Sequence, residues 1–419
     1  MPVNPVGSAF FSSAILLCSC GVPGVGSEAE GVSVAPGPCG RGLLVVESDY
    51  QSSNASALSF DGRVLSESLV RSRTESAGFG VALSGDAVLP STVQAGPRIA
   101  LIDRFPSGVL RFVDLASART TSELAVGTGF LANPQDYLEI SEHKAYVARY
   151  ERNSRPGQEA WDSGGDLLIV DPSVPVITGR IDLEPALASA APQFSPHPGQ
   201  LLSVDGRVFA VLAAYADDYR TATTSRLVEV DPVSDELVAT VELTGLARCA
   251  SLALSPDHTE LAVACTGDAL QSASPNLLGS GLAVIDITGA PRLRRRFEAS
   301  AFGRDPLSFS LAYAAPGVLL FTTFGHLDDS GHVAAQDTLL RLDTASGQVD
   351  SLLSSESAPF SLGAVRCQPG CGLCFVADAE RAGGSVLRFT VDGAGALGTP
   401  SAIQVERRIG LPPRYLSEF

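Results

Sequence analysis

The stretch from Gly129 to Leu183 decides the fold, and it reads GFLANPQDYLEISEHKAYVARYERNSRPGQEAWDSGGDLLIVDPSVPVITGRIDL. Four short apolar runs occur in it, at Tyr137–Ile140, Ala145–Tyr150, Leu167–Val170 and Val176–Ile181. Turn-forming residues separate these runs, which is the pattern of β-strands joined by two tight turns and one long loop. The stretch therefore predicts an antiparallel meander of four strands, lettered A to D here in chain order.

The same unit recurs along the chain, and an aspartate marks the end of each strand C. These aspartates are Asp61, Asp114, Asp171, Asp231, Asp286, Asp343 and Asp392, with successive spacings of 53, 57, 60, 55, 57 and 49 residues. A carboxylate at such a position can accept hydrogen bonds from backbone N–H groups of the next turn, so we interpret the series as turn formers rather than catalytic groups. Seven repeats of roughly this length predict a β-propeller with seven blades.

Strand A is missing from the first unit, and the C-terminal run Ile409–Leu416 is the only unassigned segment that can supply it. A strand from the C-terminus would complete the first blade and remove an open sheet edge. The predicted fold is therefore an all-β, seven-bladed β-propeller of four-stranded antiparallel blades over residues 39–419, with its ring closed by the C-terminal segment.

Three short segments carry a resemblance to a known family. Asn133–Asp136, Lys144–Tyr150 and Asp166–Pro172 resemble YncE-like seven-bladed β-propellers, and the resemblance covers about residues 40–419. It implies the propeller fold. It leaves the function open, because propellers include lactonases, dehydrogenase subunits and proteins that only bind a partner.

The N-terminus has the composition of a targeting segment. Ser8–Leu17 is a run of apolar and small residues that is too short to span a bilayer as a helix. The following Leu17-Cys18-Ser19-Cys20-Gly21 resembles a bacterial lipobox, which implies that Cys20 is lipidated and begins the mature chain. The segment lacks the usual basic residues, so an ordinary secretory signal is the alternative. We expect a signal peptide over 1–20, a flexible tether over 21–38, and a protein of the cell envelope, anchored to the outer membrane through lipid.

Composition limits the partners. The 419 residues carry a net charge of −17, which disfavours binding to nucleic acid because phosphates are repelled. In the basic run at 292–296, Arg292, Arg294 and Arg296 alternate, so we place them on the solvent face of an outer strand. We expect a monomer without a required cofactor.

Motifs of catalysis are absent from the sequence: it contains no GxSxG, HExxH, P-loop or Rossmann fingerprint in a suitable context. One group of ligand-like residues, His326, Asp328, Asp329 and His332, could bind a divalent metal such as zinc, although a solvated loop explains the same residues.

Strand B ends in or near an acid in each unit, and these acids are expected on the face that carries the B–C loops. The sole tryptophan, Trp161, also falls in a B–C loop. An acidic face with an exposed aromatic side chain suits a cationic or protein partner, and solubility alone is the alternative explanation. The candidate binding face comprises Asp49, Asp103, Glu151, Trp161, Asp217, Asp268, Asp328 and Asp378.

The cysteines that remain after Cys18 and Cys20 are even in number, which in an exported protein favours disulfides. Cys249 and Cys265 are symmetric about the turn at 255–259, and Cys367 and Cys374 are symmetric about Gly370-Cys371, so each pair lies across a hairpin. Cys39 then lies beside Cys371 if the ring closes. We predict the pairs Cys249–Cys265, Cys39–Cys371 and Cys367–Cys374, with exchange among Cys367, Cys371 and Cys374 left open.

Three functions remain. The first is an envelope-tethered propeller that binds a protein or small molecule through its B–C loops. The second is a propeller enzyme of lactonase or related hydrolase type, which would be favoured by an Arg or His with two carboxylates in the central channel. The third is a structural envelope protein.

Overall fold

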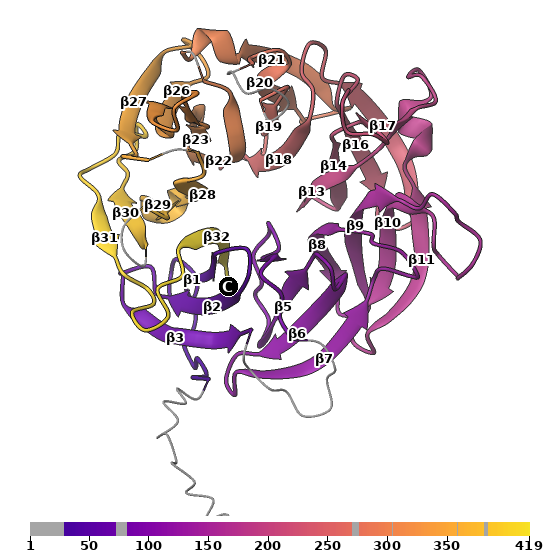
Figure 1. Ribbon diagram of the computed structural model, residues 1–419, viewed down its shortest axis with the longest axis horizontal. Helices are drawn as coiled ribbons and strands as arrows, with labels where there is room; N and C mark the ends of the chain where they lie inside the picture. The colour runs from indigo at the N-terminus through magenta and orange to yellow at the C-terminus, as the bar shows by residue number, and fades with distance from the viewer. Residues whose placement is uncertain (1–28, 73–81, 270–275, 304, 358, 381–383) are drawn as a thin grey trace, which may run out of the picture.

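The structure is a computed structural model that describes residues 29–72, 82–269, 276–303, 305–357, 359–380 and 384–419. Its strands form seven four-stranded antiparallel sheets, which are arranged in a ring around a central axis (Figure 1). The predicted all-β, seven-bladed propeller is confirmed. Within the described ranges, no helix is long and apolar enough to cross a membrane.

The blades follow one another in chain order, and each runs from an inner strand A to an outer strand D. Blades 1 and 2 contain β32 (Pro413–Glu418), β1 (Leu43–Ser48), β2 (Ser53–Leu58) and β3 (Val64–Arg71), then β4 (Ala87–Val88), β5 (Arg98–Asp103), β6 (Val109–Asp114) and β7 (Arg119–Ala125). Blades 3 and 4 contain β8 (Pro134–Ser141), β9 (Lys144–Arg152), β10 (Gly164–Asp171) and β11 (Val176–Asp182), then β13 (Pro198–Val204), β14 (Arg207–Leu212), β16 (Arg226–Asp231) and β17 (Glu236–Glu242).

The remaining blades repeat this order. Blade 5 contains β18 (Cys249–Leu254), β19 (Glu260–Thr266), β20 (Ser280–Asp286) and β21 (Arg292–Glu298). Blades 6 and 7 contain β22 (Leu307–Ala315), β23 (Val318–Thr323), β26 (Thr338–Asp343) and β27 (Val349–Ser354), then β28 (Leu362–Gln368), β29 (Leu373–Asp378), β30 (Ser385–Thr390) and β31 (Ser401–Ile403). Two small sheets lie in the loops. β12 (Phe194–Ser195), in the D–A loop before blade 4, pairs with β15 (Tyr215–Ala216), in the B–C loop of that blade. β24 (His326–Leu327) and β25 (Val333–Ala335) form a hairpin in the B–C loop of blade 6.

The C-terminal segment closes the ring as predicted. β32 is the inner strand of blade 1 and pairs antiparallel with β1, with Glu418 opposite Leu43 and Leu416 opposite Val45. The strand begins at Pro413, four residues after the expected start at Ile409. Its pairing removes the open edge that β1 would otherwise present to solvent.

The hydrophobic core is divided among the interfaces between neighbouring blades, with one cluster for each interface in the described residues. Successive side chains of a strand point to opposite faces of its sheet. In β1, Leu43 and Val45 therefore pack toward blade 7, while Leu44 and Val46 pack toward blade 2. Both faces of strand B are buried, which explains why its sequence is continuously apolar.

The inner strands are joined around the ring by side-chain hydrogen bonds, and each of the seven junctions between neighbouring blades carries at least one. The donor and acceptor pairs are Ser91 with Asp136, Leu201 N–H with Asp136, Leu252 N–H with Gln200, Ser251 with the Phe309 carbonyl, Val365 N–H with Ser310, Gln368 with Glu418, and Ser417 with the Pro90 carbonyl. Polar residues in the innermost strands thus have a structural use.

The turn function of the repeating aspartates is confirmed. Each of the seven accepts a hydrogen bond from a backbone N–H group within the next four residues. At Asp343, the bonds from the Ser346 N–H and hydroxyl lower the carboxyl pKa. The basic run also lies as expected, because β21 is the outer strand of blade 5 and Arg292, Arg294 and Arg296 are exposed.

The N-terminal tail differs from expectation in its described part. Residues 29–38 belong to the expected tether, yet Val32 is 6% exposed and its N–H donates to the Leu115 carbonyl over 2.6 Å. Ser66 also donates to the Glu30 carbonyl. This segment therefore packs on blades 1 and 2. The expected signal peptide and Cys20 lie outside the described residues.

Candidate functional site

The loops of the propeller divide between its two ends. Because neighbouring strands are antiparallel, the B–C loops and the D–A loops lie at one end of each blade, and the A–B and C–D turns lie at the other. We call the first end the B–C face. The predicted binding residues fall there because they follow strand B.

Recurring polar pairs link the start of strand A to the end of strand B at this face. In blade 2, the Arg104 guanidinium donates to Asp86 with an Nε–Oδ1 distance of 3.1 Å. The other pairs are Asn133 with Glu151 in blade 3, Arg248 with Asp268 in blade 5, and His326 with Asp305 in blade 6. The acids at the strand ends are thus paired within their own blades.

The predicted acids are at the B–C face, but the structure does not bring them together into one site. Asp103 is fully buried and accepts hydrogen bonds from Ser84, while Asp378 is 4% exposed and accepts one from the Glu380 N–H. Asp49 and Asp328 accept hydrogen bonds within their own turns. Glu151 and Asp217 alone approach a common feature, the aromatic cluster below.

Trp161 lies on an ordered loop. Its side chain is 41% exposed, and its carbonyl accepts a hydrogen bond of 2.6 Å from Arg149, whose guanidinium also forms a fully buried ion pair with Asp166. Asp162 accepts bonds from three N–H groups of the same loop, at 157, 158 and 159. These bonds fix the backbone of the loop that carries the exposed indole.

Sequence reasoning missed a cluster of four rings between blades 3 and 4. Tyr150 lies 4.7 Å from His197 between ring centroids, and Tyr215 and Tyr219 lie 5.5 and 5.2 Å from His197. The Tyr219 hydroxyl donates to Glu151. Tyr150 lies near the end of β9, Tyr215 lies in β15 and Tyr219 follows β15, so tyrosines near the end of strand B were the available signal. We call this group the His197 cluster.

A serine and a carboxylate continue the His197 cluster. Ser195 Oγ lies 2.9 Å from His197 Nε2 and 3.3 Å from Asp217 Oδ1. A serine next to a histidine can act as a nucleophile when a substrate reaches it. Here Ser195 is 0% exposed and His197 is 2% exposed. Burial also lowers the pKa of His197 to about 4, so its imidazole is neutral at pH 7.

Arg366 of the inner strand β28 is affected by the charges of two carboxyl groups, Glu418 and Asp136, from two other inner strands. Burial lowers the pKa of Arg366, and the nearby charges of Glu418 and Asp136 act in the opposite direction. Burial raises the pKa of Glu418 to about 7 and that of Asp136 to about 6. Among the described residues, Arg366 forms no ion pair within 4.0 Å, and its Nε has no hydrogen-bond acceptor. We call these residues the channel triad.

The predicted metal ligands lie in or next to the β24–β25 hairpin. His326 Nδ1 lies 3.4 Å from Asp305, and His332 Nδ1 lies 3.8 Å from Asp328. The structure thus separates the two histidines into different pairs. In the part of the chain that the structure describes, no three His, Cys, Asp or Glu side chains group as metal ligands.

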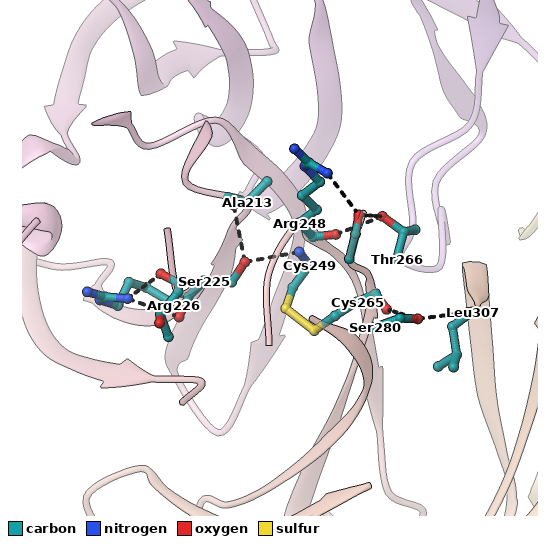
Figure 2. Close-up of a disulfide and its surroundings, with 11 residues drawn as sticks. Ala213, Ser225, Arg226, Arg248, Cys249, Cys265, Thr266, Ser280 and Leu307 are labelled. Carbon is teal, nitrogen blue, oxygen red and sulfur yellow. Dashed lines mark hydrogen bonds between the residues drawn. A yellow bond between two sulfur atoms is a disulfide. The ribbon is translucent and has the colours of Figure 1, made fainter. Parts of the chain in front are cut away.

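All three predicted disulfides are confirmed. Cys249–Cys265 lies across the β18–β19 hairpin at the B–C face, next to Arg248, and both cysteines are fully buried (Figure 2). Cys39–Cys371 joins residues that are 332 apart in sequence, and Cys367–Cys374 joins residues that are 7 apart. Disulfides of this number are typical of proteins outside the cytoplasm.

Known structures share the fold. A 6-phosphogluconolactonase-like protein of Bacteroides fragilis is 10% identical over 89% of this chain and 96% of its own, with a TM-score of 0.55. The periplasmic gluconolactonase of Pseudomonas aeruginosa is 14% identical over 90% and 98%, with a TM-score of 0.53, and a protein of Lactobacillus plantarum is 11% identical over 90% and 98%, with a TM-score of 0.54. No family model and no curated protein sequence matches the chain. The likeness at these identities shows the β-propeller fold.

Proposed function

We propose that this protein is an extracytoplasmic, membrane-tethered propeller that binds a ligand or partner through its B–C face without chemically changing it. One observation carries the proposal. The large aromatic side chains that the described residues expose all lie at that face: Tyr50, Phe105, Trp161, Phe309 and Phe360. Exposed aromatic rings are enriched where proteins bind partners, because they bury much apolar area with little loss of side-chain freedom.

The opposite end of the molecule exposes a different type of apolar residue. Away from the B–C face, the exposed large apolar residues of the described ranges are all valines, at Val93, Val174, Val176, Val233 and Val238. These lie in A–B and C–D turns or on outer strands. A single exposed valine needs no partner to explain it. The aromatic residues are therefore distributed asymmetrically between the two ends, as a single binding face requires.

Binding is favoured over nucleophilic catalysis because the Ser195–His197 pair is buried and a substrate cannot reach it. The test uses the immobilised protein in wild-type form, a Phe105→Ser/Trp161→Ser variant and a Val174→Ser/Val233→Ser variant of the opposite end. Each is incubated with envelope extract and metabolite pools, and retained components are identified by mass spectrometry.

We expect a component that wild type and the valine variant retain and the aromatic variant loses. Equal retention by all three proteins would contradict a binding role for the B–C face. Near-UV circular dichroism and melting temperature establish that both variants are folded.

A lactonase or related hydrolase is the second candidate, and the channel triad favours it. Arg366 can stabilise an oxyanion, and Glu418, whose pKa is raised to about 7, can act as general base or acid, whereas Asp136 is buried and can contribute only its charge. The Pseudomonas relative in fold is a gluconolactonase by name. Hydrolysis of glucono-lactone by the wild type, lost in Arg366→Gln, would establish this function. No turnover above the uncatalysed rate leaves the binding role.

The proposal also includes a protein family and a cellular location. We infer a YncE-like lipoprotein of the outer membrane, supported by the propeller, the three disulfides and the lipobox-like Leu17–Gly21. Cys20→Ser should release the protein from membranes, because the lipid supplies the membrane affinity. Fractionation and intact-mass analysis measure it, and a Cys18→Ser variant is the control. A Cys20→Ser protein that stays with membranes would contradict the anchor.

A further inference from the structure

One sector of the B–C face, over blades 6, 7 and 1, combines aromatic rings with an arginine. Phe309 and Phe360 are 44% and 38% exposed, and each contacts Phe324, at 5.4 and 5.0 Å between ring centroids. The Arg414 guanidinium lies 5.3 Å from the centre of the Tyr50 ring, which is 55% exposed. Arg414 also donates to the Phe360 carbonyl, so the five residues are connected. We call them the Arg414 arc.

Arg414 has donors left for a ligand. A guanidinium carries five N–H groups. One donates to the Ser48 carbonyl from Nε at 3.3 Å, and one donates to Phe360 from Nη1. Among the described residues, Nη2 has no acceptor and no carboxylate lies within 4.0 Å of Arg414. Three other arginines at this face, Arg104, Arg149 and Arg248, are by contrast paired with Asp86, Asp166 and Asp268.

The position of Arg414 suits a small ligand. It is the second residue of β32, an inner strand, so it lies beside the axis rather than at the rim (Figure 1). The side chain is half-buried, and the exposed Tyr50 ring lies against its guanidinium. Phe360, whose carbonyl accepts from Arg414, leads through Phe324 to Phe309. A half-buried cation beside apolar rings can pair with an anionic group while the rings cover an apolar body.

We propose that the Arg414 arc binds a small organic carboxylate with an apolar or aromatic body. This inference rests on the proposed binding role of the B–C face and names one ligand class for it. The fork of Nη1 and Nη2 N–H groups matches the two oxygens of a carboxylate, and this geometry distinguishes carboxylates from single-point anions. The net charge of −17 opposes non-specific anion binding, so the selectivity has to come from the local contacts.

Ligand-observed NMR titration tests the proposal with three probes of one shape. These are 2-naphthoate, neutral 2-naphthamide and cationic 2-naphthylmethylamine. For the wild type, we expect 2-naphthoate to bind on the order of tenfold more tightly than 2-naphthamide, because charge-assisted hydrogen bonds are about twice as strong as neutral ones. Arg414→Gln should weaken 2-naphthoate to the level of 2-naphthamide and leave 2-naphthamide unchanged.

Two further variants complete the design. Phe309→Ser removes an exposed ring and should weaken both naphthoate and naphthamide several-fold. Arg294→Gln, on the outer strand β21, is the matched control and should change neither. Equal binding of 2-naphthoate to wild type and Arg414→Gln would overturn the proposal, as would a preference of the wild type for the cationic probe.

The outcome separates this inference from the function on which it rests. If the naphthoate result fails while the Phe105→Ser/Trp161→Ser variant still loses a retained component, the ligand class is wrong and the binding face stands. If both fail, the proposed function fails as well.

Discussion

Glu47 is a buried carboxyl group at the heart of blade 1. It is 1% exposed, its Oε2 accepts a hydrogen bond of 3.0 Å from Asn54, and its Oε1 has no hydrogen-bond partner among the described residues. Burial raises its pKa to about 8, and the negative charge of Glu406 adds to the rise. The group is therefore protonated at neutral pH, as a buried acid without a cation must be.

Because Glu47 has a raised pKa in the folded state, we predict that the free energy of unfolding decreases as pH rises. Below the unfolded pKa of 4.5 the carboxyl is protonated in both states, and between 4.5 and about 8 only the unfolded state releases its proton. From pH 5 to pH 9, the free energy of unfolding should decrease by roughly 2–4 kcal/mol on account of this group. Glu47→Gln should flatten the profile in urea denaturation, and the exposed Glu236→Gln should leave it unchanged. Coincident profiles of wild type and Glu47→Gln would contradict the assignment.

For His197 we predict the opposite effect at acid pH, where the free energy of unfolding decreases as pH falls. Its folded pKa of about 4 lies below the ordinary histidine pKa of 6.5, so the unfolded state binds the proton first as pH falls. Stability should be complete above pH 6.5 and decrease by about 2–3 kcal/mol on acidification to pH 4. His197→Asn should lose less stability over this range, because asparagine tolerates the positive φ of 49° and has no proton to bind. An NMR titration that places the His197 pKa near 6.5 would contradict the prediction.

Two disulfides constrain very different lengths of chain, one between blades 1 and 7 and one across the β28–β29 hairpin of blade 7. Cys39–Cys371 spans 332 residues and Cys367–Cys374 spans 7. In the chain-entropy model, the longer loop stabilises the fold by roughly 5–6 kcal/mol and the shorter by about 2–3 kcal/mol, both as upper bounds.

We therefore expect Cys39→Ser/Cys371→Ser to lower the denaturation midpoint more than Cys367→Ser/Cys374→Ser does. Guanidinium denaturation without reductant measures both. Equal losses would show that strain or residual structure, rather than loop length, determines the stabilisation.

The features that could be predicted from the sequence are those determined by residues close together in the chain. The apolar runs, the turn aspartates and the hairpin cysteines each depend on neighbours in the chain, so strands, blade order and disulfides were accessible. The closing strand was accessible because a sheet edge needs a partner.

The His197 cluster was not predicted, because it joins a strand of blade 3 to loops of blade 4, and tyrosines near strand ends do not show which of them meet. It also depends on the left-handed backbone of His197, which no glycine marks. Arg366, Asp136 and Glu418 come from three different inner strands, and each alone resembles an ordinary charged residue. The packing of Val32 depends on the shape of a neighbouring blade, which composition does not reveal.

The described part of the N-terminal segment and the B–C face lie at opposite ends of the molecule. Val32 bonds to Leu115, which follows strand C of blade 2, and Arg41 bonds to Gln94 in the A–B loop of the same blade. Both contacts belong to the end away from the B–C face. If Cys20 carries the lipid, the chain leaves the membrane at that end and the B–C face points outward.

This geometry predicts how the two ends respond to a large probe. A biotin acceptor peptide after Gly157, in a B–C loop, should bind streptavidin when the lipoprotein is on liposomes, because the loop faces solvent there and a Cβ built on Gly157 would have no neighbour within 4 Å. The same peptide after Ser173, in a C–D turn, should bind it more slowly. In detergent, both should react equally. Faster binding of streptavidin at the Ser173 insertion on liposomes would show that the orientation is the reverse of the one predicted.

The closing strand also has a consequence for the order of synthesis and folding. A ribosome makes β1 to β3 early, yet β1 gains its inner partner only when residues 413–418 arrive, although Leu43 and Glu418 are neighbours in the sheet. During synthesis and any passage across a membrane, the first blade is therefore incomplete while the other six can already assemble. A chaperone or a quality-control protease that recognises the unpaired edge of β1 would distinguish the newly synthesised, incompletely folded protein from the folded protein.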